Sequence, residues 1–132
     1  MKFASLRIIT SDISALAAFY REVTGIEPVA YTEDYLEFKT PACILAIGSK
    51  RSMDMYGKGA AKPAANQTAI LEFQVEDVDR EYTRLKNSVG KFELEPTTQP
   101  WGNRSMLFRD PDGNLINFFT PVSGAAKAKY DA

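Results

Sequence analysis

Histidine is absent from the 132-residue chain, and cysteine occurs once, as Cys43. Histidine is the commonest transition-metal ligand and the usual acid–base group near neutral pH. Its absence excludes Ser-His-Asp and Cys-His catalytic machinery and imidazole-based zinc, iron or nickel sites. A single cysteine provides neither an intramolecular disulfide nor a thiolate cluster. This is compatible with a reducing compartment, and we expect a cytoplasmic protein.

Long hydrophobic runs and an excess of charge of either sign are also lacking. No apolar stretch approaches the roughly 20 residues that span a bilayer. The polar run 10–12 follows the first apolar residues too soon for the core of a signal peptide. Sixteen basic and 17 acidic residues give a net charge of −1, which provides no long-range attraction to phosphate backbones or anionic membranes. We therefore expect neither nucleic-acid nor membrane partners.

The pattern that is present is one structural unit that occurs twice. Residues 3–9 predict a strand, and Ser11 and Asp12 are candidate caps of a helix that Gly25 ends. Three short strands separated by turn residues follow this helix: 29–32, 35–40 and 43–47. The same order returns later, where Asp77 caps and Gly90 closes a second helix. Its flanking strands are predicted over 68–75, 92–95, 105–109 and 115–120.

The segment 48–66 is a long connection between the two units, in which we expect at most a short helix. Its apolar side chains Met53, Met55 and Tyr56 form either an adaptable lid or a dimer contact. Neither unit alone, at about 60 residues, buries much surface, so both are expected to share one core. The sequence thus predicts a single α+β domain over 1–122. Its modules are 1–60 and 66–122, and a polar tail, for which disorder is one interpretation, covers 123–132.

Three local motifs carry a resemblance to a known family. The first motif comprises Ser11-Asp12-Ile13, Phe19-Tyr20 and Thr24-Gly25-Ile26. The second is Val75-Glu76-Asp77-Val78-Asp79. The third comprises Pro100-Trp101-Gly102 and the run from Arg109 to Ile116. Together they resemble the vicinal-oxygen-chelate superfamily of glyoxalases, bleomycin-resistance proteins and extradiol dioxygenases, and the third is most like the bleomycin-resistance branch. The resemblance covers roughly residues 3 to 121. It implies two βαβββ modules that form a curled mixed sheet around a cleft, and a homodimer.

The resemblance also implies where a metal ion would bind, namely at four side chains, two from each module. The matching positions hold Ser5, Ala46 (give or take one residue), Ile70 and Asn117. A hydroxyl and an amide are weak neutral donors, whereas a divalent ion needs anionic or imidazole ligands. We therefore expect no metal, no cofactor and none of the metal-dependent activities of the family.

The alternation of side chains along strands indicates what occupies the cleft instead. If Ser5, Ile70 and Asn117 face it, then Arg7, Glu72 and Phe119 do so as well. The resemblance adds Trp101, which matches a ligand-lining tryptophan of bleomycin-resistance proteins, and Phe38 is a further aromatic candidate. The predicted ligand-binding residues are Ser5, Arg7, Phe38, Glu72, Trp101, Asn117 and Phe119, and no residue is assigned a catalytic or metal-binding role.

These residues favour a metal-free protein that binds a small molecule, for example one that sequesters an antibiotic or an aromatic metabolite. A metal-independent lyase or isomerase is the alternative, with Glu72 as base and Arg7 stabilising an oxyanion. A Mg²⁺ or Ca²⁺ site at Glu72 and Glu37, and an interaction module with a vestigial cleft, also remain open. Two structural alternatives stand beside them: Arg7 and Glu72 pair only with each other, and Trp101 only packs its loop.

Overall fold

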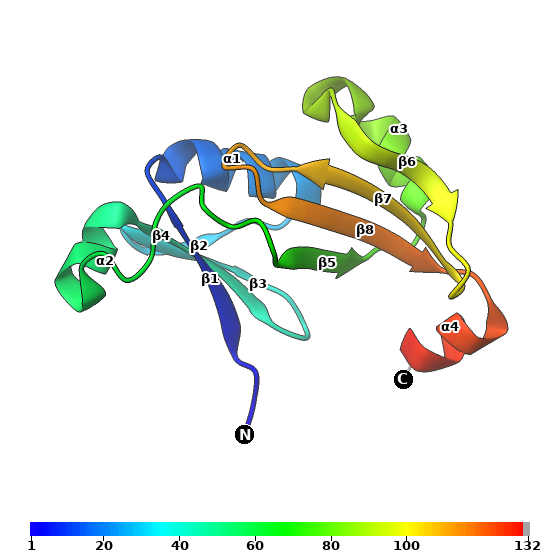
Figure 1. Cartoon of the computed structure of the whole chain (residues 1–132), viewed down its shortest axis with the longest axis horizontal. Coiled ribbons are helices and arrows are strands. Elements are labelled where there is room, and N and C mark those ends of the chain that lie inside the picture. The colour runs from blue at the N-terminus through cyan, green and yellow to red at the C-terminus, as the bar shows by residue number, and fades with distance from the viewer. Residues whose placement is uncertain (131–132) are drawn as a thin grey trace. The chain divides into compact units, whose positions relative to one another are not determined.

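The computed structural model describes residues 1–130 of the chain (Figure 1). One compact unit comprises residues 1–66 with 111–113, and the other comprises 67–110 and the segment from 114 onward. Each unit contains a four-stranded mixed sheet, a long helix after its first strand and a short helix after its last. The α+β class and the two βαβββ modules are thus confirmed, while a cleft enclosed by both modules stays a prediction. No helix among residues 1–130 is long and apolar enough to cross a membrane.

The first unit places its last strand in the middle of its sheet. Its elements are β1 (Ser5–Thr10), α1 (Ile13–Thr24), β2 (Val29–Thr32), β3 (Tyr35–Lys39), β4 (Ile44–Ser49) and α2 (Lys50–Gly57). The strand order across the sheet is β1-β4-β3-β2. Because β4 pairs parallel with β1 and antiparallel with β3, it joins residues from both ends of the module.

Helix α1 packs on one face of this sheet. The Asp12 side chain caps it by accepting a hydrogen bond from the Ala15 amide at 3.0 Å. Gly25 ends the helix in the left-handed conformation, with a φ of 71°, as the sequence predicts. On the buried side of the helix, the ring of Tyr20 lies 6.2 Å from that of Phe38 in β3. This face of the sheet is therefore the core of the first unit.

The second unit repeats the same topology. Its elements are β5 (Ile70–Gln74), α3 (Val78–Val89), β6 (Phe92–Thr98), β7 (Asn103–Arg109), β8 (Leu115–Pro121) and α4 (Gly124–Tyr130). The strand order is β5-β8-β7-β6, with β8 parallel to β5 and antiparallel to β7. The two sheets are thus built in the same way, as expected of a repeated unit.

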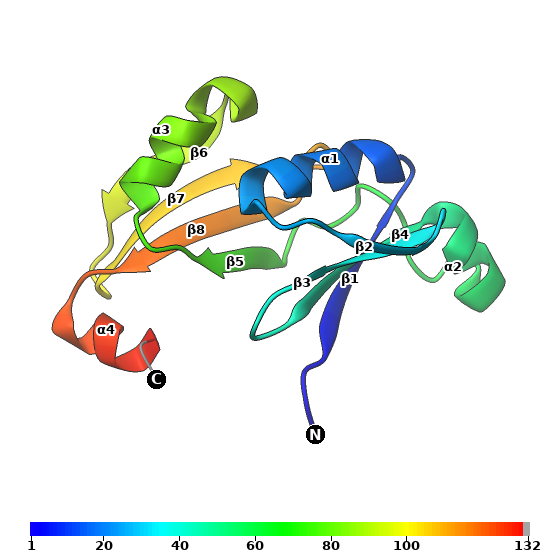
Figure 2. The same cartoon turned by 180° about the vertical axis from the view of Figure 1, so that it is seen from behind.

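Helix α3 packs on one face of the second sheet, along β6 and β7 (Figure 2). The Asp77 side chain caps the helix by accepting a hydrogen bond from the Arg80 amide at 3.2 Å. Leu85 is fully buried, and the ring of Tyr82 lies 4.9 Å from that of Phe92. As in the first unit, one face of the sheet is taken up by core packing, which leaves the other face for the predicted binding residues.

The end of the chain differs from the sequence prediction, because residues 124–130 form α4 instead of a disordered tail. Ser123 begins this helix by accepting a hydrogen bond from the Ala126 amide at 3.1 Å. Alanine is the strongest helix former, and the segment contains three. Burial of Ala126 and the contact of the Tyr130 ring with Phe119, at 4.9 Å, then fix the helix in place. The rest of the predicted tail, residues 131–132, lies outside the described residues.

Candidate functional site

The face of each sheet opposite α1 or α3, here called its second face, carries most of the predicted binding residues. In the first sheet, strand register aligns Arg7 of β1 with Ala46 of β4, and Ala46 with Glu37 of β3. Residues aligned in this way point to the same side of a sheet. Ser5 lies two residues before Arg7 on the same strand and is exposed. The alternation argument therefore places Ser5 and Arg7 on one face with Ala46 and Glu37.

Arg7 is held between two tyrosines. The central carbon of its guanidinium lies 5.1 Å from the ring centre of Tyr35 in β3 and 5.3 Å from that of Tyr56 in α2. Both distances are within the range of cation–π attraction. Within the first unit, which the structure describes in full, no carboxylate forms an ion pair with Arg7. Its charge is thus stabilised by aromatic faces.

Tyr35 connects Arg7 to the carboxylate of Glu37. The Tyr35 hydroxyl donates a hydrogen bond to Glu37 Oε2 at 2.7 Å. Burial, reinforced by this hydrogen bond, raises the pKa of Tyr35, and the nearby Arg7 opposes the increase. The phenol therefore stays a neutral hydrogen-bond donor, and the Glu37 carboxylate is engaged by Tyr35.

Helix α2 is anchored to the turn between β2 and β3. Ser49 Oγ donates to Asp34 Oδ1 at 2.7 Å, and Arg51 forms an ion pair with Asp34 at 2.8 Å. The hydrogen bond from Arg51 is the main cause that lowers the pKa of Asp34. These contacts fix the orientation of the helix that carries Tyr56. Sequence reasoning named Tyr56 only as part of a lid or dimer contact, because the anchor depends on residues in a different turn.

The second sheet brings two predicted residues into direct contact. Register aligns Glu72 of β5 with Asn117 of β8, and Asn117 Nδ2 donates a hydrogen bond to Glu72 Oε2 at 2.8 Å. This bond fixes the orientation of the amide, because only its nitrogen can donate to a carboxylate. Asn117 Oδ1 is buried and accepts no hydrogen bond among the described residues. The pair therefore contains one buried acceptor that residues 1–130 do not satisfy.

Phe119 lies on the same face as this pair, two residues beyond Asn117 on β8. It is aligned with Gln74 of β5 and with Ser105 of β7. Only 5% of Phe119 is exposed, and the ring of Tyr130 in α4 packs on it. Phe119 is thus covered by α4, a helix that the sequence analysis missed, and its role in lining a ligand site stays a prediction.

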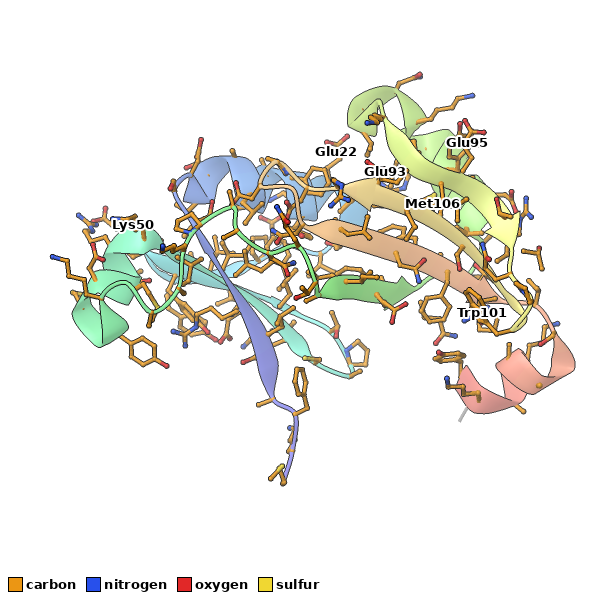
Figure 3. All side chains as sticks on the ribbon, in the orientation of Figure 1. Glu22, Lys50, Glu93, Glu95, Trp101 and Met106 are labelled. Atoms are coloured by element: carbon orange, nitrogen blue, oxygen red, sulfur yellow. The ribbon has the colours of Figure 1, made fainter. Side chains whose placement is uncertain are left out.

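Trp101 lies at the tip of the β6–β7 hairpin, beside the start of α4 (Figure 3). Its side chain is 67% exposed, so packing of the loop does not account for it. The tip is held tightly, because the Gly102 carbonyl accepts the amides of Val122 and Ser123 at 2.8 and 3.1 Å. The hairpin therefore presents an indole to solvent on a rigid support, and the ligand role of Trp101 stays a prediction.

Phe38 is the exception among the predicted residues. It is 1% exposed and contacts Tyr20 on the face that α1 covers. Alternation explains this position, since its neighbours Glu37 and Lys39 point to the second face. We therefore remove Phe38 from the candidate site and assign it to the core.

The four positions at which the family resemblance implies metal ligands do not fit a metal ion. Ala46 is fully buried and Ile70 is 49% exposed, and neither has a donor atom. Ser5 is neutral, and Asn117 directs its nitrogen at Glu72. Among residues 1–130, no group of three or more His, Cys, Asp or Glu side chains could hold a metal ion. Glu72 and Glu37, which we considered for Mg²⁺ or Ca²⁺, offer too few donors on this evidence.

Comparison with known proteins adds the family. The profile described as Glyoxalase/Bleomycin resistance protein/Dioxygenase superfamily matches residues 2–118. The uncharacterized protein YraH of Bacillus subtilis (strain 168) is 30% identical over 126 residues, covering 90% of this chain and 98% of YraH. Among solved structures, a glyoxalase/bleomycin resistance protein/dioxygenase from Nocardioides has a TM-score of 0.77 at 22% identity, covering 94% of this chain and 85% of that chain. A glyoxalase/bleomycin resistance protein/dioxygenase family enzyme from Burkholderia phytofirmans PsJN has a TM-score of 0.80 at 14% identity. The match covers 92% of this chain and 100% of that chain.

The two solved structures share the fold with this chain. The family profile and YraH go further, because both match nearly the whole chain. The resemblance predicted from the sequence motifs is confirmed at the level of the superfamily, whereas the bleomycin-resistance branch stays a prediction. The chain therefore belongs to the glyoxalase/bleomycin resistance protein/dioxygenase superfamily.

Proposed function

We propose that this protein binds a small organic molecule directly through side chains, without a family-type metal ion. The observation that carries the proposal is the Glu72–Asn117 hydrogen bond of 2.8 Å on the second face of the second sheet. In this pair, Asn117 stands where the family resemblance implies a metal-binding carboxylate. An amide that is bound to a neighbouring carboxylate is suited to hydrogen bonding and not to coordination.

The polarity of the pair indicates the ligand it would favour. Leaving a buried acceptor such as Asn117 Oδ1 unpaired costs about 1–3 kcal/mol. Because this oxygen has almost no exposed surface, a ligand would reach it only after neighbouring side chains move. The exposed Glu72 carboxylate still has lone pairs available beyond the bond from Asn117. The preferred ligand therefore carries hydrogen-bond donors such as amine, amide or hydroxyl groups.

Aromatic side chains near the pair support a flat ligand. Phe119 follows Asn117 on the same face of β8, and Tyr130 extends this apolar surface. Trp101 offers an exposed ring elsewhere in the same unit. Aromatic rings with a few polar groups are typical of small-molecule sites. Sequestration of an aromatic metabolite or an antibiotic is the form of the function that we propose, in a cytoplasmic homodimer.

A metal-independent enzyme is less well supported. A carboxylate that acts as general base near neutral pH usually sits in a desolvated environment. Glu72 is exposed and accepts a hydrogen bond from an amide, which is the environment of a binding contact. Arg7, the proposed oxyanion partner, belongs to the other unit. Binding without turnover is therefore our first choice, and turnover is an outcome that the experiment below would detect.

The test is a ligand screen by thermal shift, followed by calorimetric titration of each hit and by product analysis. The panel pairs aromatic compounds that carry amine or hydroxyl donors with matched compounds in which these donors are methylated. We expect the donor compounds to bind more tightly, and Asn117→Leu and Glu72→Gln to weaken them about ten-fold, as for the loss of one hydrogen bond to a charged group. Glu76→Gln is the control, because Glu76 is exposed and forms a long ion pair with Arg80 at 4.0 Å.

Equal affinity of the donor and methylated compounds would contradict the role of the Glu72–Asn117 pair. Failure of all compounds to bind would favour the interaction module with a vestigial cleft. Conversion of a hit into product would instead support the enzyme alternative. These outcomes are separable because the titration measures affinity and the product analysis measures chemistry on the same samples.

A further inference from the structure

The charge of Arg7 is exceptional among the arginines of the chain, all of which lie within the described residues. Each of the others forms an ion pair with a carboxylate; they are Arg21, Arg51, Arg80, Arg84, Arg104 and Arg109. No carboxylate of the first unit pairs with Arg7, although this residue lies on a sheet face and not at the end of a mobile loop. A cation on a sheet face without an anionic partner in its own unit is a candidate anion receptor.

Two rings hold the Arg7 guanidinium in place. Its central carbon lies 5.1 Å from the ring centre of Tyr35 and 5.3 Å from that of Tyr56. The Tyr35 hydroxyl also forms a hydrogen bond with Arg7, but a guanidinium has five N–H donors, and the ring faces offer no lone pair to the others. The donors therefore keep capacity for an external acceptor, and the rings reduce the entropy that a free arginine side chain loses on binding.

The carboxylate that could have quenched this charge is engaged elsewhere. Glu37 lies on the same face, with Ala46 between it and Arg7 in the register. Two strand spacings separate the backbones by about 10 Å. Glu37 accepts the hydrogen bond of the Tyr35 hydroxyl at 2.7 Å. Tyr35 thus stabilises Arg7 with its ring and its hydroxyl and engages Glu37 with the same hydroxyl, and no ion pair forms between Arg7 and a carboxylate of this unit.

The position of Tyr56 is fixed by the fold. A Cβ atom at Gly48 of β4 would lie 3.0 Å from Ser52 Oγ of α2 and 3.8 Å from Arg7 Cδ. A larger residue would require the Ser52 and Ile9 side chains to shift by a few tenths of an ångström, so glycine favours this close approach of the helix to the sheet. The Ser49 and Arg51 contacts with Asp34 hold the same helix at its first turn. The fold therefore holds the Tyr56 ring in its position over Arg7.

We infer from this arrangement that the first unit carries a binding site for a planar carboxylate, and specifically for an aromatic carboxylic acid. The fork of the Arg7 guanidinium matches a carboxylate in two parallel N–H···O bonds. The edges and faces of Tyr35 and Tyr56 then supply contact area for the aromatic ring of the ligand. All residues of this site belong to the first unit, so the inference goes beyond the proposed function and does not depend on the Glu72–Asn117 pair.

The test uses the full chain with benzoate as probe and benzamide as its neutral counterpart of the same shape. Calorimetry measures affinity, and NMR follows the Arg7 Nε–Hε resonance, which a merely structural arginine would not shift on addition of benzoate. We expect benzoate to bind at least ten-fold more tightly than benzamide and to shift this resonance. Arg7→Met should weaken benzoate binding about ten- to hundred-fold, as for the loss of a charge-assisted pair.

Two further variants separate charge from geometry. Arg7→Lys keeps the charge but loses the planar fork, so it should bind benzoate several-fold more weakly than the wild type. Tyr56→Leu removes one ring of the clamp and should also weaken binding. Arg21→Met is the matched control, because Arg21 is exposed and forms an ion pair with Glu27 at 3.1 Å, away from Arg7. If Arg7→Met does not fold, the benzoate affinity of Arg7→Lys compared with that of the wild type tests the role of Arg7.

Equal affinity for benzoate and benzamide would overturn the inference, as would benzoate binding that Arg7→Met and Arg7→Lys leave unchanged. The absence of benzoate binding to the wild type at millimolar concentration would overturn it as well. A shift of the Arg7 Nε–Hε resonance that saturates together with the calorimetric signal would establish the site.

Discussion

The ring of Tyr130 lies 4.9 Å from the ring of Phe119, in a tilted arrangement of 58°. This contact brings α4 onto the second face of the second sheet. Helix α2 makes the corresponding contact in the first unit, where Tyr56 lies over Arg7. Both modules therefore end in a short helix whose tyrosine returns to the face that the long helix leaves uncovered. The repeated unit is consequently βαβββα; the sequence analysis allowed a short helix after the first module but predicted none after the second.

Replacement of Tyr130 by alanine tests the contribution of this contact. An aromatic pair contributes about 0.5–1.5 kcal/mol beyond the area that it buries. We expect Tyr130→Ala to lower the free energy of unfolding by about 1 kcal/mol or more in urea titrations, and to expose Phe119. Lys127→Ala in the same helix is the control, because Lys127 is exposed, and it should change stability by less than about 0.5 kcal/mol. Equal effects of both substitutions would show that α4 does not depend on the ring contact.

Much of the fold could be predicted because its signals are local. Asp12 and Asp77 accept amides of their own first helical turns, and the glycines that end these helices act within one turn. Helix α4 could not be predicted in this way. Seven residues are too few to form a stable helix alone, so the helix depends on the packing of Tyr130 on Phe119 of the preceding strand.

In the candidate site, too, local sequence signals place some residues, whereas others come together only in the folded structure. Alternation along β1 and β5 correctly grouped Arg7 with Ser5 and Glu72 with Ile70, because a strand fixes the side of each residue relative to its neighbours, whereas their position in a cleft stays a prediction. The same rule, applied strictly, would have removed Phe38, which is one residue away from Glu37. The partners of these residues were beyond sequence reasoning. Tyr56 reaches Arg7 through a helix whose approach is favoured by the absent side chain of Gly48.

Gly102 is a second position where a missing side chain permits a close approach. Its φ is 96°, and a Cβ atom there would clash with Ser123 Oγ and lie 2.7 Å from Ser123 Cβ. We expect Gly102→Ala to cost about 2–4 kcal/mol, because backbone strain and overpacking act together. Gly25→Ala separates the two causes, since Gly25 also has a positive φ, 71°, but has open space around it. Its cost should stay near 1 kcal/mol. Similar melting temperatures of the two variants would contradict the packing of Ser123 on Gly102.

The anchor of α2 predicts a pH dependence of stability. The hydrogen bond from Arg51, followed by that from Ser49, lowers the pKa of Asp34 below the ordinary value of 3.8. A carboxylate with a lowered folded-state pKa stabilises the protein fully above its unfolded pKa and loses this effect as the pH falls through the folded pKa. Asp34→Asn should therefore be less stable than the wild type at pH 6, and the difference should shrink as the pH falls below 3.8. Denaturant titrations at several pH values measure it, with Glu76→Gln as the exposed control. A difference that is constant with pH would rule out the anchor as its source.

Removal of metal ions should leave this protein unchanged. Ala46 and Ile70 provide no donor atom at two of the four positions implied by the family, so elemental analysis of the purified protein should find less than one equivalent of any divalent metal, and a chelator should not change its melting temperature. Asn117→Glu is the informative comparison. It introduces a carboxylate aligned with Glu72, and like charges at such close range repel. Divalent cations should then raise the melting temperature of Asn117→Glu and not that of the wild type. A stoichiometric metal in the wild type, with a melting temperature that falls on chelation, would mean that other residues form a ligand set and that binding through side chains alone is wrong.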